Sequence, residues 1–154
     1  MIKYIQGDIF CPPFLFNVFV HGCNAFCKME SGVAKGVKDL WPEAAEVDAN
    51  TLRGDAFKLG TYTKAIISED LTVVNAYTQY YYGRKPGVLY VDYDEVKRVM
   101  ALINKDFPEP AIIGMPKIGA GLAQGDWKKI EEILNSVFKD REILVYEYSP
   151  KEAK

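Results

Sequence analysis

The sequence has few of the residues that build metal sites and disulfide frameworks. It contains one histidine, His21, and three cysteines, Cys11, Cys23 and Cys27. An odd cysteine count in one early region argues against a disulfide framework and predicts a reducing compartment. A zinc site built from His21, Cys23 and Cys27 would lack a fourth ligand, so we expect no metal.

Long apolar runs and blocks of one charge are also missing. No apolar stretch approaches the roughly 18 residues that span a bilayer, and the N-terminus lacks a basic segment followed by an apolar one. We therefore expect a cytoplasmic protein with no membrane partner. The net charge is -2, with acids and bases scattered along the chain, so nucleic acid is not an expected partner either.

What the sequence does contain fits one α/β domain. Its 154 residues are 49% hydrophobic, which supplies one ordinary core. Strand patterns alternate with amphipathic helices, which predicts a three-layer α/β/α fold with a mixed, largely parallel central sheet. We place the domain at residues 1–150 and a charged C-terminal tail at 151–154. The expected strands cover residues 1–6, 17–21, 61–67, 71–76, 111–115 and 142–148, and the expected helices begin near residues 33, 43, 92 and 127.

Local patterns add detail to this plan. Helical spacing predicts that Val37, Leu40 and Trp41 face the core, and Pro42 should stop that helix. Asp126 precedes another amphipathic run, where it fits an N-cap. Residues 77–90 are rich in tyrosine, glycine and proline, and we expect a loop there.

Two glycine-bearing segments, residues 24–34 and 118–127, each leave a predicted strand and enter a predicted helix. In such folds, ligands bind at the carboxyl ends of strands, where helix N-termini present free N–H groups. Gly119 and Gly121 leave room for an anion to approach the backbone, and a diphosphate fits such a nest. One glycine loop alone could simply be a tight turn. Two loops favour binding, while the spacing through Gly125 matches neither a dinucleotide fingerprint nor a P-loop.

A family resemblance extends over nearly the whole chain, and its motifs occur in order. The chain resembles a macro domain, the ADP-ribose-binding module. It is most similar to small bacterial and phage members described as ADP-ribose-1''-phosphate phosphatase-like, which are related to the animal terminal ADP-ribose-protein glycohydrolase. The motifs are Gly7-Asp8-Ile9, His21-Gly-Cys-Asn24, Ser31-Gly-Val-Ala34, Gly60, Asn75-Ala-Tyr-Thr-Gln79 with Tyr82-Gly83, Ile118-Gly-Ala-Gly-Leu122 and Gly125-Asp-Trp127.

The resemblance implies a role for each part of the site. Asp8 would accept a hydrogen bond from the adenine amino group, although a plain turn residue is the alternative. Asn24 would bind the distal ribose, and residues 118–122 would hold the diphosphate. Tyr146 is a candidate for an aromatic contact with adenine, or an ordinary core residue. The predicted ligand-binding residues are Asp8, Ile9, Asn24, Ser31, Gly32, Val33, Ile118, Gly119, Ala120, Gly121, Leu122 and Tyr146.

Catalysis is less well specified. The glycohydrolase branch uses a lysine nucleophile and an acidic residue, but Gln79 and Ala123 occupy the matching positions here, which disfavours a lysine-adduct mechanism. The candidate catalytic residues are Asn24, which could hold a water, and His21, whose alternative is a buried structural role.

Two functions therefore remain open. One is a weak hydrolase, acting as an ADP-ribose-1''-phosphate phosphatase or ADP-ribosyl ester hydrolase. The other is a non-catalytic module that binds ADP-ribose or an ADP-ribosylated molecule. We expect a monomer without a cofactor. The aromatic and basic residues 80–85 predict a lid or packing loop, with stacking on nucleic-acid bases as the alternative.

Overall fold

The computed structural model describes residues 1–148, and the predicted tail at 151–154 lies outside this range. The strands are β1 (Ile2–Gln6), β2 (Val18–Asn24), β3 (Tyr62–Ser68), β4 (Leu71–Gln79), β5 (Ile113–Pro116) and β6 (Ile143–Glu147). The helices are α1 (Gly32–Leu40), α2 (Pro42–Ala49), α3 (Tyr93–Asp106) and α4 (Trp127–Val137), with a 3-10 turn, η1, at Ala56–Lys58. All the predicted strands and helices are present, and η1 was not predicted.

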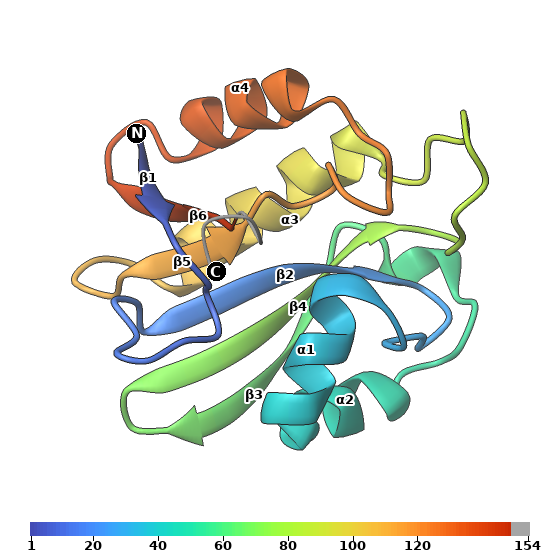
Figure 1. Cartoon of the computed structure of the whole chain (residues 1–154), viewed down its shortest axis with the longest axis horizontal. Coiled ribbons are helices and arrows are strands. Elements are labelled where there is room, and N and C mark those ends of the chain that lie inside the picture. The colour runs from blue at the N-terminus through green and yellow to red at the C-terminus, as the bar shows by residue number, and fades with distance from the viewer. Residues whose placement is uncertain (149–154) are drawn as a thin grey trace.

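The six strands form one sheet in the order β1-β6-β5-β2-β4-β3. The β3–β4 pair is antiparallel and the other pairs are parallel. Helices α1 and α2 cover one face of the sheet and α3 and α4 cover the other (Figure 1). The predicted three-layer α/β/α fold is confirmed. No helix among residues 1–148 has the length and apolar character needed to cross a bilayer.

The central strand β2 is buried on both faces. Val18 and Val20 pack in the cluster beneath α3 and α4, whereas Phe19 packs beneath α1 and α2. Because successive side chains of a strand point to opposite faces, an apolar run such as this one fits the interior of a sheet. The position of β2 brings the residues that follow it to the middle of the sheet edge.

Helix α1 has a narrower buried face than its sequence predicts. Val37 and Trp41 are buried, but Leu40 is 45% exposed, so its predicted core position is wrong. The helix ends at Leu40, and the backbone of Trp41 leaves the helical conformation just before Pro42 begins α2. Proline disfavours the helical conformation at the residue before it, so the spacing that placed Leu40 and Trp41 on one helix face does not hold here.

Strands β2 and β4 run further than the sequence indicates. In the parallel pair, Cys23 lies opposite Tyr77 and Asn24 opposite Gln79. The predicted loop at residues 77–90 therefore begins only after Gln79. Because the two strands are parallel, Asn24 and Gln79 reach the same edge of the sheet.

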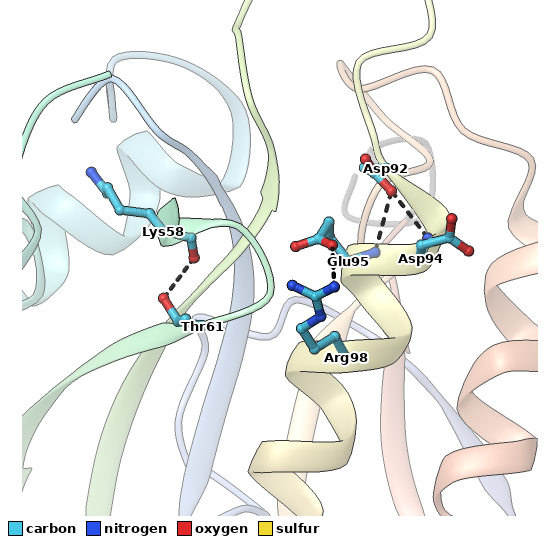
Figure 2. Close-up of polar contacts among 6 residues, drawn as sticks. All are labelled: Lys58, Thr61, Asp92, Asp94, Glu95 and Arg98. Atoms are coloured by element: carbon cyan, nitrogen blue, oxygen red, sulfur yellow. Dashed lines mark hydrogen bonds and ion pairs between the residues drawn. The ribbon is translucent and has the colours of Figure 1, made fainter. Parts of the chain in front are cut away.

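Helix α3 starts at a side-chain cap beside the turn that leads into β3 (Figure 2). The Asp92 carboxylate accepts hydrogen bonds from the amides of Asp94 and Glu95, at 3.1 and 3.2 Å. In the neighbouring turn, the Thr61 hydroxyl donates to the Lys58 carbonyl at 2.6 Å, and the Lys58 side chain points away from α3 (Figure 2). Asp126 caps α4 in the same way as Asp92 caps α3, as predicted.

Candidate functional site

A pocket of about 490 Å³ opens at the carboxyl ends of β2, β4 and β5. The ends of parallel strands form the usual ligand site of α/β folds. The pocket is lined by the loop between β2 and α1, the segment after β4 and the loop between β5 and α4. The lining residues are Gly22, Cys23, Asn24, Lys28, Glu30, Ser31, Gly32, Val33, Ala34, Gln79, Tyr82, Gly83, Arg84, Pro116, Lys117, Ile118, Gly119, Gly121, Leu122 and Ala123.

The two predicted glycine loops meet across this pocket. A Cβ atom placed on Gly32 would lie 3.2 Å from Cδ1 of Leu122, so the loops are in direct contact. The predicted site residues at 24, 31–33, 118–119 and 121–122 all line the pocket, while Ala120 belongs to the second loop but lies outside the lining. The structure thus places residues separated by most of the chain around one cavity.

The N-terminus of α1 contributes positive partial charge to the pocket. Ser31 occupies the N-cap position, but its side chain makes no capping hydrogen bond within the described chain, and the first turn carries no acidic residue. The amide groups of Gly32 and Val33 therefore remain available at the pocket surface. Free amides and the helix dipole together favour an anion at such a position.

The loop between β5 and α4 presents further amides. Its shape is fixed by a hydrogen bond from the Gly125 amide to the Gly119 carbonyl at 2.6 Å. Gly119 has a φ of +75°, and a Cβ there would lie 2.8 Å from Val91 Cγ2, so both conformation and packing require glycine. Around Gly121, by contrast, no described atom lies within 4 Å of an added Cβ. A side chain at position 121, which belongs to the pocket lining, would therefore meet open space.

Asn24 holds the first loop in shape. Its amide Nδ2 donates to the Lys28 carbonyl at 2.9 Å, and its Oδ1 accepts from the Phe26 amide at 2.9 Å. The residue is 8% exposed and still lines the pocket. Since Nδ2 carries two hydrogens, one remains available for a bound group.

A buried lysine, Lys58, stabilises the loop between β2 and α1. Lys58 is 7% exposed, and its ammonium donates to the Ala25 carbonyl at 3.0 Å and to the Thr51 hydroxyl at 2.6 Å. It also lies 4.8 Å from the centroid of the Tyr77 ring. The Tyr77 hydroxyl in turn donates to Asp48 at 2.7 Å, and burial raises the pKa of Asp48. These contacts tie the loop after β2 to η1 and α2.

The charged side chains in the lining are mostly cations. Lys28, Arg84 and Lys117 face a single acidic residue, Glu30. Lys117 already pairs with Glu147, at 3.2 Å. Neither Lys28 nor Arg84 is among the predicted ADP-ribose-binding residues. An excess of cations beside free amides makes the pocket suitable for an anionic ligand.

His21 lies outside the pocket lining and is 1% exposed. Its Nε2–H donates to Asn75 Oδ1 at 2.6 Å, because the Asn75 amide nitrogen is occupied with the Ala44 carbonyl and the Thr63 hydroxyl. Burial lowers the pKa of His21 from 6.5 to about 4, opposed in part by the hydrogen bond with Asn75. The imidazole is therefore neutral at pH 7, and its surroundings match the structural alternative.

Asp8, Ile9 and Tyr146 also lie outside the lining. Asp8 is exposed in the turn after β1, where its Oδ1 accepts from the Phe10 amide at 2.9 Å. Ile9 and Tyr146 share one buried cluster, and Tyr146 packs edge-on against Phe16. Because β1 and β6 are parallel neighbours in the sheet, these residues occupy the same sheet edge as the pocket. Their adenine-binding roles stay predictions.

The remaining pocket residues limit the chemistry. Gln79 and Ala123 line the pocket. By the resemblance, these positions match the lysine nucleophile and the acidic residue of the glycohydrolase branch. Of the aromatic run at residues 80–85, Tyr82 and Arg84 line the pocket, whereas the rings of Tyr80 and Tyr81 pack edge-on against Phe26. Within residues 1–148, no three His, Cys, Asp or Glu side chains gather as metal ligands.

Whole-length relatives exist among known sequences, although no family model matches the chain. An uncharacterized 17.5 kDa protein from the tk-vs intergenic region of Enterobacteria phage T4 is 34% identical over 97% of this chain and 98% of its own. An ADP-ribose 1''-phosphate phosphatase of Debaryomyces hansenii is 28% identical, covering 95% of this chain and 98% of that protein. The ADP-ribose glycohydrolase OARD1 of Bos taurus is 24% identical, covering 96% and 91%.

Solved structures share the fold. A macrodomain protein from Streptomyces coelicolor superposes with a TM-score of 0.75 at 21% identity, covering 97% of this chain and 100% of that one. DarTG of Thermosipho africanus, solved in complex with ADP-ribose, gives a TM-score of 0.71 at 17% identity, covering 99% of this chain and 42% of that one. With these relatives, this fold and these motifs, the chain belongs to the macro domain family.

Proposed function

We propose that this chain binds ADP-ribose or a derivative of it in the pocket and hydrolyses the derivative weakly. The observation that carries the proposal is the meeting of two glycine loops, whose free amides line one cavity. Two whole-length relatives are named for acting on ADP-ribose compounds, and one structural neighbour was solved with ADP-ribose, which supports the same ligand class.

In this proposal the diphosphate lies between the start of α1 and the loop at residues 118–122. The amides of Gly32, Val33 and Gly121 donate to its oxygens, and the helix dipole adds to the attraction. The distal ribose lies against Asn24, whose second amide hydrogen is available. The uncommitted carboxylate oxygen of Asp8 accepts from the adenine amino group.

The reaction that suits these residues is hydrolysis by a held water. An ADP-ribose-1''-phosphate phosphatase or an ADP-ribosyl ester hydrolase needs no lysine adduct, consistent with Gln79 and Ala123 in the lining. Asn24 holds the water beside the distal ribose. His21 lies outside the pocket and has a structural role: its hydrogen bond to Asn75 keeps β2 and β4 in register. It does not act as an acid or a base.

Calorimetry with ADP-ribose and one pocket-filling variant tests the binding site. Gly121→Val adds bulk into open pocket space, so we expect an unchanged unfolding midpoint and lost ADP-ribose binding. Asp8→Ala should weaken ADP-ribose much more than ribose 5-phosphate, because only ADP-ribose carries adenine. Intact affinity in Gly121→Val would show that the diphosphate lies elsewhere.

Phosphate release separates the enzyme from a non-catalytic binding module. We expect slow release from ADP-ribose-1''-phosphate, and loss of that release in Asn24→Ala with folding retained. If the wild-type chain binds ADP-ribose but releases neither phosphate from ADP-ribose-1''-phosphate nor ADP-ribose from an ADP-ribosyl ester, the binding module is favoured.

A further inference from the structure

We propose that Lys28 binds a phosphate monoester at the distal end of the ligand, so that the pocket selects ADP-ribose-1''-phosphate over ADP-ribose. This inference rests on the proposed function. Lys28 lies in the loop between β2 and α1 and lines the pocket together with Asn24 and Ser31, which flank it in the sequence. A ligand whose distal ribose contacts Asn24 therefore ends within reach of the Lys28 side chain.

Of the two lysines in the lining, Lys28 is the less strongly paired. Its Nζ lies 3.9 Å from Glu30, whose side chain is 70% exposed, and such an exposed pair contributes little. Lys117 is bound to Glu147 at 3.2 Å. Arg84 is exposed at the pocket rim. A ligand anion would thus meet Lys28 without first breaking a strong ion pair.

The position of Lys28 is set by the fold. The Asn24 side chain bonds to the Lys28 carbonyl at 2.9 Å and to the Lys28 amide at 3.4 Å. The Lys28 ammonium lies 5.8 Å from the centroid of the Tyr82 ring, which also lines the pocket. The side chain is 31% exposed, so it is partly shielded from water. These bonds fix the Lys28 backbone at the pocket, and a partly desolvated ammonium there can distinguish a charged group from a neutral one.

The two ligands differ in charge at this end. ADP-ribose ends in a hydroxyl group, which gains little from an ammonium. A phosphate monoester adds a charge of about -1.5 to -2 at pH 7 and three strong acceptor oxygens. The backbone amides bind the diphosphate that both ligands share. Lys28 therefore contributes to the affinity for ADP-ribose-1''-phosphate alone.

Calorimetry on three variants with both ligands tests the inference. For Lys28→Gln we expect about a tenfold loss of affinity for ADP-ribose-1''-phosphate, the low end for a charged hydrogen bond in a half-exposed site. Affinity for ADP-ribose should stay within about twofold, because the shared contacts are untouched. Lys28→Arg should recover most of the loss. Lys35→Gln is the matched control, since it removes the same charge from α1 outside the lining.

The outcomes distinguish a failure of the Lys28 assignment from a failure of the proposed ADP-ribose binding. A selective loss in Lys28→Gln, with Lys35→Gln unchanged, supports the assignment. Equal losses for both ligands, or no loss for either, would overturn it while leaving ADP-ribose binding in place. A wild-type chain that bound neither ligand would overturn the proposed function and this inference together.

Discussion

Acidification should destabilise the protein through its one histidine. In the unfolded chain His21 protonates near pH 6.5, whereas burial keeps it neutral in the folded chain down to about pH 4. Between these values the unfolded state binds more protons, so stability is complete above pH 6.5 and falls as the pH is lowered towards 4. At about 1.4 kcal/mol per pH unit, the gap between the two pKa values corresponds to about 3 kcal/mol of unfolding free energy.

Denaturant unfolding at pH 7 and pH 4 measures this loss, and His21→Gln supplies the reference. Glutamine does not titrate, and its amide can still donate to Asn75. Carboxylates contribute equally to both proteins, so the wild type should lose about 3 kcal/mol more than the variant between the two pH values. The imidazole signal in an NMR titration reports the same group directly. Equal losses, or an imidazole that titrates near pH 6.5, would refute the burial argument.

Three further predictions concern stability and are checked by denaturant unfolding at pH 7. Lys58→Met should lower the unfolding free energy by about 3 kcal/mol, because the buried Ala25 carbonyl and the half-buried Thr51 hydroxyl lose a charged donor; the exposed Lys97→Met is the control and should change little. Gly119→Ala should cost about 2 kcal/mol, since φ is +75° and the Cβ contacts are too short; an unchanged midpoint would mean that the loop repacks freely. Asp92→Ala removes the cap of α3 and should cost about 1 kcal/mol, whereas no effect would show that the cap is replaceable.

The sequence predicted the layers well because periodicity reports which faces are buried. The strand predicted at residues 17–21 became β2 and the helix predicted near residue 92 became α3, whose Val96, Val99, Met100 and Ile103 are fully buried. The prediction for Leu40 was wrong because Trp41 is not helical, so the helical spacing that grouped Leu40 with Val37 and Trp41 does not hold at the end of α1.

Tertiary contacts account for what the sequence did not reveal. Residues 77–79 read as a loop, yet they extend β4 because β2 offers a partner strand. The sequence left a catalytic and a structural role open for His21, and only the tertiary packing shows that the residue is fully buried. Lys28 was not predicted as a site residue, because its place in the pocket depends on the hydrogen bonds that Asn24 makes to the loop.

The contact between Gly32 and Leu122 makes two distant positions in the sequence depend on each other. A Cβ at position 32 would lie 3.2 Å from Cδ1 of Leu122, so the Leu122 side chain would have to shift slightly to admit it. An asparagine at 32, which accepts the left-handed backbone, should fit better in chains where the residue at 122 is smaller than leucine. In an alignment of homologous sequences, these two columns should covary, and a double-mutant cycle should be strongly non-additive.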